Sequence, residues 1–198
     1  MKKLELIKNG NLIIKNCKKP RLKKGHSLIK IGHVGACSSD IARGFSNGAY
    51  FYPLVMGHEA MGYVEKTDSP ALKPGDKVVI FPLLPCFNCI SCKTKNYQTC
   101  NDYSYYGSRR DGAYQEYLLV KNWNLLKLPR TIYDADAALI EPMAVMVHVK
   151  NIIKKIYENE RKFNNANGAI IGGGFLSLLL SDILTNIGVK PPDVFDRN

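Results

Sequence analysis

Residues 86–100 read CFNCISCKTKNYQTC and place four cysteines in one short segment. Cys86, Cys89 and Cys92 follow one another at intervals of three residues, and Cys100 comes after a short loop. Thiolates spaced in this way can surround one zinc ion, which prefers four ligands in a tetrahedron. Because all four ligands are cysteines, no position is left for water or substrate. The segment therefore predicts a structural zinc site, with unligated cysteines (free or disulfide-bonded) or an iron–sulfur cluster as alternatives.

The composition of the 198-residue chain favours a folded cytoplasmic protein. Apolar residues make up 45% of it, and no apolar run approaches the about 20 residues that a membrane-spanning helix needs. The N-terminal segment MKKLELIK has no uninterrupted apolar stretch and is a poor signal peptide. Since four of the six cysteines are clustered and no secretion signal precedes them, metal binding in a reducing compartment is favoured over disulfides.

The formal net charge is +11, with the lysines scattered along the chain. A solvated basic surface is the simplest explanation, and a nucleic-acid partner is the alternative. A basic surface also suits a phosphorylated substrate and a dinucleotide.

Residues 1–133 form the first predicted domain, which is mostly β. Short apolar runs alternate there with turn residues, which is typical of strands. The predicted strands cover residues 27–31, 62–65, 76–81, 114–120 and 124–128. Residues 134–157 then show helical spacing, with Asp134 as the expected N-cap. Pro142 is expected to kink or restart this connecting helix.

A polar stretch, residues 158–168, is predicted to separate a last segment, residues 168–198. This segment contains an apolar strand at 169–171, three consecutive glycines, an apolar helix at 176–186 and a second strand at 194–195. The order strand, glycine-rich turn, helix and strand is typical of the start of a Rossmann domain.

Four residues far apart in the sequence form a second candidate metal site: Cys37, His58, Glu59 and Glu141. Taken singly, each has an ordinary explanation, such as a small buried thiol or a surface pair. Together they supply thiolate, imidazole and carboxylate groups, the usual ligands of a catalytic zinc that keeps an exchangeable position. Spacing alone leaves both explanations open.

The order of motifs resembles the zinc-dependent medium-chain alcohol and polyol dehydrogenases over essentially the whole chain. The shared motifs are GACSSD at 35–40, GHE at 57–59, PGDKV at 74–78, the four-cysteine lobe, DGAYQEY at 111–117, Glu141-Pro142 and the glycines at 172–174. Within this family, PLLPCF at 82–87 and GSRRDG at 107–112 most resemble the galactitol-phosphate dehydrogenases. The resemblance implies an α+β protein: a GroES-like β-barrel catalytic domain with the inserted zinc lobe, followed by the truncated β-α-β start of a Rossmann domain.

The resemblance also implies roles for individual residues. Cys37 and His58 would bind a catalytic zinc, with Glu141 or Glu59 supplying the carboxylate. Asp40 would orient a ligand such as His58, and Ser39 would pass the substrate proton toward solvent. Two zinc ions per chain, a polyol or sugar-alcohol phosphate substrate and a homo-oligomeric full-length form are therefore expected.

The glycine cluster predicts a dinucleotide site, because it follows a strand and opens a helix. Gly172 and Gly174 occupy the first two positions of the Gly-x-Gly-x-x-Gly motif, and Ser177 replaces the third, so we expect a weakened site. Asp196, at the end of the second strand, is placed to bind the ribose hydroxyls and favours NAD over NADP. A glycine-rich turn without a ligand is the alternative.

Two adjacent arginines, Arg109 and Arg110, suggest a phosphate contact. A planar guanidinium matches a phosphate in a bidentate way, so one of them is a candidate to bind a sugar-alcohol phosphate. An exposed arginine pair, or an ion pair with Glu116, is the alternative.

The sequence leaves three functions in competition. The first is a zinc-dependent NAD(P) oxidoreductase acting on a secondary alcohol of a polyol or polyol phosphate. Only 31 residues follow from Gly168 onward, whereas a complete Rossmann domain needs on the order of 130, so we expect little activity from this chain alone. The others are a catalytically dead zinc-binding fragment and a basic zinc module that binds nucleic acid.

Overall fold

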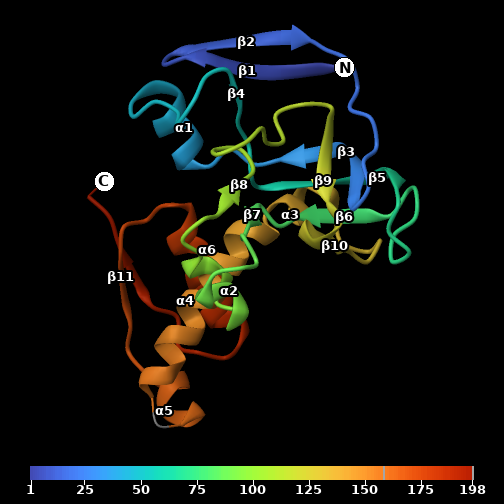
Figure 1. The fold of residues 1–198 in the computed structure, drawn as a ribbon. Helices are drawn as coiled ribbons and strands as arrows, with labels where there is room; N and C mark the ends of the chain where they lie inside the picture. Colours follow the sequence, from blue (N-terminus) through green and yellow to red (C-terminus); the bar gives the residue numbers. More distant parts are fainter. Residues whose placement is uncertain (158, 198) are drawn as a thin grey trace. The chain divides into compact units, whose positions relative to one another are not determined.

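The computed structural model describes residues 1–157 and 159–197. It contains two compact units, Met1–Leu139 and Ile140–Asn198 (Figure 1). No helix among the described residues is long and apolar enough to cross a membrane.

The first unit is built on a five-stranded antiparallel sheet in the order β10-β6-β5-β3-β9. The strands are β3 (His26–Val34), β5 (Ala60–Thr67), β6 (Lys77–Ile80), β9 (Tyr117–Lys121) and β10 (Leu125–Lys127). Each lies on one of the five predicted strands, so the β prediction for this unit is confirmed. Residues 114–116, predicted to be part of a strand, precede β9 instead, because the Tyr114 N–H bonds to the Met56 carbonyl outside the sheet.

Two smaller sheets complete this unit, and the sequence analysis did not predict them. The first has the order β2-β1-β4, and the second pairs β7 with β8. The bounds are β1 (Lys2–Lys8), β2 (Asn11–Asn16), β4 (Leu54–Val55), β7 (Leu83–Leu84) and β8 (Ser104–Tyr105). In β1 the lysines mask the apolar alternation, although Leu6 is fully buried against Leu54 and Met56.

The core of the first unit lies on the five-stranded sheet. Ile29, Val64, Val78, Ile80 and Val120 come from four of its strands and are almost fully buried in one cluster. Burying side chains of this size stabilises the fold by about 1.5–3 kcal/mol each. This rigid sheet supports the loops that carry the candidate ligands.

Short helices connect these strands. They are α1 (Ser38–Phe45), α2 (Ile90–Lys93), α3 (Asp134–Ala138) and the 3₁₀ helices η1 (Tyr97–Thr99) and η2 (Asn122–Asn124). The N-cap of α3 is Tyr133, and Asp134 is already helical, so the predicted Asp134 cap is wrong. Its carboxylate instead accepts a hydrogen bond from the Tyr63 hydroxyl and pairs with Lys77.

The predicted connecting helix is divided at Leu139, which caps α3. The next helix, α4 (Ile140–Ile156), belongs to the second unit, and Pro142 lies in its first turn. Proline is tolerated there because the first helical N–H groups have no partner within the helix. The helix thus restarts at Ile140 with Pro142 in its first turn, which is the second of the two predicted outcomes, and no kink at the proline is needed.

The second unit contains one β-α-β element. Parallel strands β11 (Ala169–Ile171) and β12 (Asp193–Phe195) are joined through α6 (Phe175–Asn186), as the sequence predicted. A further helix, α5 (Glu160–Asn164), lies within the predicted polar boundary, of which Glu158 falls outside the described residues. The buried core of the unit consists of Met146, Phe163, Leu180, Leu184 and Val189.

Candidate functional site

The four lobe cysteines converge on one point. Their sulfur atoms lie within 4.8 Å of one another. Three Sγ–Sγ distances are 3.5 Å for Cys89–Cys92, 3.9 Å for Cys86–Cys92 and 3.9 Å for Cys89–Cys100. Tetrahedral zinc with Zn–S bonds of about 2.3 Å requires sulfur atoms about 3.8 Å apart. The arrangement therefore fits a zinc ion bound by four thiolates.

Backbone N–H groups point at these sulfur atoms. The N–H groups of Asn88 and Cys89 donate to Cys86 Sγ at 3.5 and 3.4 Å. A bond from the Cys92 backbone lowers the pKa of Cys89 to about 6, whereas burial raises the pKa of Cys92 to about 12. Opposite pKa shifts are expected among neighbouring thiols, because several thiolates close together repel one another. A bound dication compensates their negative charge and allows all four to ionise.

The lobe has more apolar packing than the sequence indicates. Phe87 and Tyr97 of the lobe meet the indole of Trp123 edge-on, at ring-centroid distances of 5.0 and 5.3 Å. Phe81 lies 5.6 Å from the same indole. Two aromatic rings of the lobe therefore pack on Trp123, which lies outside it, and the metal is not the only source of order in the lobe.

Cys37, His58 and Glu59 lie together, although 20 residues separate Cys37 from His58. One possible ligand atom of each lies within 4.8 Å of those of the others. His58 and Glu59 are buried, with 8% and 7% of their surface exposed, and Cys37 is half-buried. Thiolate, imidazole and carboxylate in one cluster fit a catalytic zinc.

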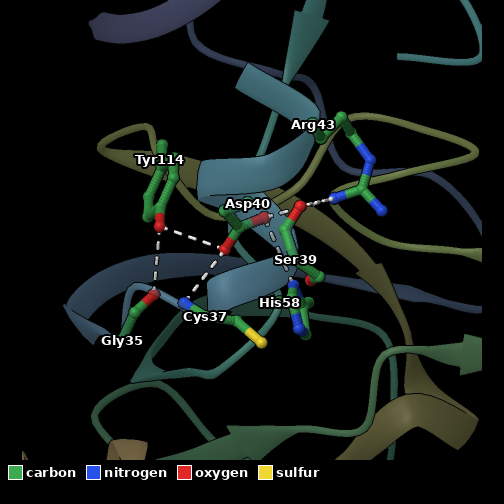
Figure 2. A network of polar contacts seen from close by, with 7 residues as sticks. All are labelled: Gly35, Cys37, Ser39, Asp40, Arg43, His58 and Tyr114. Carbon is green, nitrogen blue, oxygen red and sulfur yellow. Dashed lines mark hydrogen bonds and ion pairs between the residues drawn. The ribbon is translucent and has the colours of Figure 1, made fainter. Parts of the chain in front are cut away.

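Asp40 lies beside Cys37 and His58 and is 3% exposed (Figure 2). Its Oδ1 lies 3.5 Å from His58 Nδ1, and its Oδ2 accepts bonds from the Cys37 N–H at 3.3 Å and the Tyr114 hydroxyl at 3.1 Å. Arg43 Nη1 lies 3.5 Å from Oδ1. One carboxylate thus contacts the His58 ring and the Cys37 backbone, and the orienting role that the family resemblance implies for Asp40 stays a prediction.

Two glycines make this arrangement sterically possible. A Cβ at Gly35 would lie 2.2 Å from Glu59 Oε2, so any side chain there would displace the carboxylate. Gly57 has φ +89°, and a Cβ there would lie 2.7 Å from the Tyr114 ring. Since only glycine adopts that conformation at little cost, the ring can cover the backbone beside His58.

A cavity of about 500 Å³ opens onto His58. Ser39 and Arg43 of α1 line it, together with Tyr50, Tyr103 and Arg109. Its size falls within the about 300–1,000 Å³ that is usual for small-molecule sites. Of the site residues predicted from the sequence, Ser39 and Arg109 thus line the same cavity as His58.

The two arginines of the predicted pair are separated. Arg110 does not line this cavity; its Nε donates to Ser104 Oγ at 3.1 Å and its guanidinium lies 5.5 Å from the Tyr106 ring centroid. It lines a different depression, beside Asp111. Glu141 lies in the first turn of α4, in the second unit, and stays a predicted ligand.

The second unit holds the predicted cofactor residues. Gly172, with φ +102°, donates its N–H to the Phe195 carbonyl at 2.7 Å, and Gly174 is the N-cap of α6. The Asp196 carboxylate accepts the Gly173 N–H at 2.5 Å. Ser177 lies half-buried in the first turn of α6. The glycine turn, the helix N-terminus and Asp196 thus lie together, as a dinucleotide site requires.

Sequence reasoning missed Arg43, Tyr50 and Tyr114. Arg43 follows Asp40 by three residues on α1, so a prediction of that helix would have placed both on one face. Tyr114 follows Asp40 by 74 positions, and nothing in the local sequence links them.

Comparisons with known proteins identify the family and the fold. The family model for the alcohol dehydrogenase GroES-like domain matches residues 23–130. The chain is 39% identical over 170 residues to galactitol 1-phosphate 5-dehydrogenase of Escherichia coli K12, covering 85% of this chain and 47% of that protein. The crystal structure of galactitol-1-phosphate dehydrogenase from Escherichia coli aligns with a TM-score of 0.89 at 35% identity, covering 98% of this chain and 55% of that one.

A second solved structure is an alcohol dehydrogenase (rspB) of Escherichia coli CFT073 complexed with NADH. It aligns with a TM-score of 0.89 at 26% identity, over 100% of this chain and 57% of that one. The chain thus spans about half the length of the relatives it matches.

Proposed function

Because the chain belongs to the alcohol dehydrogenase family with a GroES-like domain, we propose that it carries the catalytic zinc site of an NAD-dependent polyol dehydrogenase. The cluster of Cys37, His58 and Glu59, of which His58 lines a cavity of about 500 Å³, is the observation that carries this proposal. The proposed substrate is a polyol or polyol phosphate with a secondary alcohol, as the names of the relatives indicate.

Zinc bound at this cluster would supply a Lewis acid that lowers the pKa of the substrate hydroxyl, and NAD would supply the hydride acceptor. Cys37, His58 and a carboxylate would hold the metal, with Glu59 inside the cluster and Glu141 as the second candidate. Asp40 holds the imidazole and the Cys37 backbone in place. The Ser39 hydroxyl, at the cavity wall, would receive the substrate proton and pass it to solvent.

We assign the glycine turn and Asp196 to the cofactor. The N–H groups at the start of α6 would meet the pyrophosphate, because the N-terminus of a helix favours negative charge. Asp196 already holds the Gly173 N–H and would accept bonds from the ribose hydroxyls. Its negative charge would repel a 2′-phosphate, so we propose NAD rather than NADP.

Metal analysis tests the zinc assignment without depending on turnover. We expect two zinc ions per chain, falling to one in Cys37→Ser and to one in Cys100→Ser. Cobalt substitution separates the sites, since a site with four thiolates absorbs more strongly in the thiolate-to-metal region than a site with one. A wild-type chain with one zinc, unchanged by Cys37→Ser, would contradict the catalytic assignment.

Activity is tested by NADH absorbance with polyols and polyol phosphates. The low turnover expected of this chain by itself stays a prediction. Zinc-dependent oxidation of a polyol that Cys37→Ser abolishes would support the dehydrogenase. A chain that holds two zinc ions yet binds neither NADH nor any polyol would instead support the catalytically dead alternative.

We also propose that the whole protein is cytoplasmic and that it is a homo-oligomer, as the family resemblance implies. All six cysteines are free, and two thiolate-containing metal sites need a reducing environment to keep their ligands. Light scattering on the whole protein would measure the assembly state, and a monomer would contradict it.

A further inference from the structure

Building on the proposed function, we propose that the cavity beside His58 binds a phosphorylated polyol, with Arg43 and Arg109 as its phosphate site. The two guanidinium groups come from segments 66 residues apart and line the same cavity. The pairing replaces the Arg109–Arg110 pair expected from the sequence.

Aromatic rings hold the Arg109 guanidinium in place. Its Cζ lies 4.3 Å from the ring centroid of Tyr103 and 5.0 Å from that of Tyr50, and both tyrosines line the cavity. Its backbone N–H donates to the Tyr105 carbonyl at 3.0 Å. A guanidinium that packs on rings keeps its N–H edge available for a planar, bidentate contact. Among the described residues, no carboxylate forms an ion pair with it.

Arg43 is fixed by two oxygens of its own helix, α1. Nη1 donates to the Ser39 carbonyl at 3.2 Å and lies 3.5 Å from Asp40 Oδ1, as Figure 2 shows. Its side chain is 16% exposed. A guanidinium has five N–H donors, and these contacts use only Nη1, so Nη2 and Nε remain for a ligand.

The charge of the cavity wall favours an anion. The lining includes two arginines and no aspartate or glutamate. A neutral polyol offers hydroxyl groups that acceptors such as carboxylates would bind, whereas a phosphate monoester carries about −1.5 to −2 charges at pH 7. Arg43 pairs with Asp40 through Nη1 alone, and Arg109 pairs with no carboxylate in the described part of the chain. In a partly enclosed cavity, the Arg109 guanidinium and the remaining N–H groups of Arg43 match the charge of a phosphate. A phosphate held there would place the polyol chain along the cavity toward His58.

The test compares galactitol 1-phosphate with galactitol on the zinc-loaded chain by isothermal titration calorimetry. We expect the ester to bind at least about 10-fold more tightly than galactitol. Arg109→Ala should lower the affinity for the ester about 10- to 100-fold and leave the affinity for galactitol unchanged. Arg110→Ala is the matched control and should change neither affinity. Arg43→Gln should lower the affinity for the ester to a similar extent. Zinc content is measured in the same samples to verify that Asp40 still holds His58.

Equal affinity for galactitol and its phosphate ester, or equal effects of Arg109→Ala and Arg110→Ala, would overturn the phosphate site and leave the polyol dehydrogenase standing. A loss of NADH affinity in Arg109→Ala with ester binding unchanged would also overturn it, because the guanidinium would then serve the cofactor. If neither polyol bound to the zinc-loaded chain, the proposed function would fail together with this inference.

Discussion

At the scale of single residues, Asp40 connects most of the site. Its two oxygens contact His58, the Cys37 backbone, Tyr114 and Arg43. A buried carboxylate is costly unless such partners satisfy it. Because His58 and Cys37 are both candidate ligands, any change in these partners should appear as a change in metal affinity before it appears as unfolding.

Tyr114→Phe tests this directly. It removes only the hydroxyl, which lies 3.1 Å from Asp40 Oδ2 and 3.2 Å from the Gly35 carbonyl, and it keeps the ring against Gly57. We expect zinc affinity at the Cys37 site to fall about 10-fold, the lower end of what loss of an outer-shell partner costs. Chelator competition measures it, with Tyr133→Phe, at a tyrosine that is 79% exposed, as the control. Unchanged affinity would mean that Asp40 needs no help from this hydroxyl.

At the scale of elements, the four-cysteine lobe combines local metal ligands with distant packing. All four cysteines lie within 15 residues, but the ring that completes the aromatic cluster belongs to η2. Phe87 also adopts φ +63°, a left-handed conformation that costs roughly 1–2 kcal/mol for a non-glycine residue. Metal binding and aromatic packing together offset this strain.

Trp123 is the single tryptophan of the chain and therefore reports on the lobe. We expect removal of the lobe zinc, by strong chelation or by Cys92→Ser, to shift its emission to longer wavelength as Phe87 and Tyr97 move away. Cys37→Ser should leave the emission unchanged, because Cys37 lies outside this cluster. Emission that responds equally to both cysteine variants would show that the lobe does not fold independently of the second site.

An ion pair of 2.6 Å between Asp134 Oδ1 and Lys77 Nζ links α3 to strand β6 of the sheet. Hydrogen bonds from Lys77 and then from Tyr63 lower the pKa of Asp134 below its ordinary value of 3.8. The stabilisation is therefore fully present above that value and is lost as the pH falls through the lowered pKa. Asp134→Asn should lower the urea midpoint at pH 7, with the gap to wild type closing under acid conditions.

Asp136→Asn, in the same helix turn, is the control for this experiment and should behave as wild type. A gap between Asp134→Asn and wild type that stays constant down to pH 2 would show that charge is not the source of the effect.

At the scale of the whole molecule, the predicted ligands are distributed over two units. Cys37, His58 and Glu59 belong to Met1–Leu139, and Glu141 belongs to Ile140–Asn198. The first unit thus brings together three donors by itself. This distribution makes the two glutamates distinguishable by experiment.

Glu59→Ala should reduce zinc affinity at the Cys37 site by more than the about 10- to 100-fold typical of an outer-shell partner, because its oxygen lies in the cluster. Chelator competition on Glu59→Ala, Glu141→Ala and the control Glu65→Ala measures the effect. If only Glu141→Ala released the metal, the carboxylate ligand would come from the second unit.

Features that depend on local spacing could be predicted from the amino-acid sequence alone. The four-cysteine lobe, the strands of the main sheet and the strand, glycine turn and helix before Asp196 could all be predicted, because each depends on neighbours a few residues away. Three relations became visible only in the folded chain: Arg109 rather than Arg110 lines the cavity, Arg43 lines it as well, and Tyr114 donates to Asp40. Those relations join residues that lie far apart in the sequence, and a local sequence pattern does not reveal them.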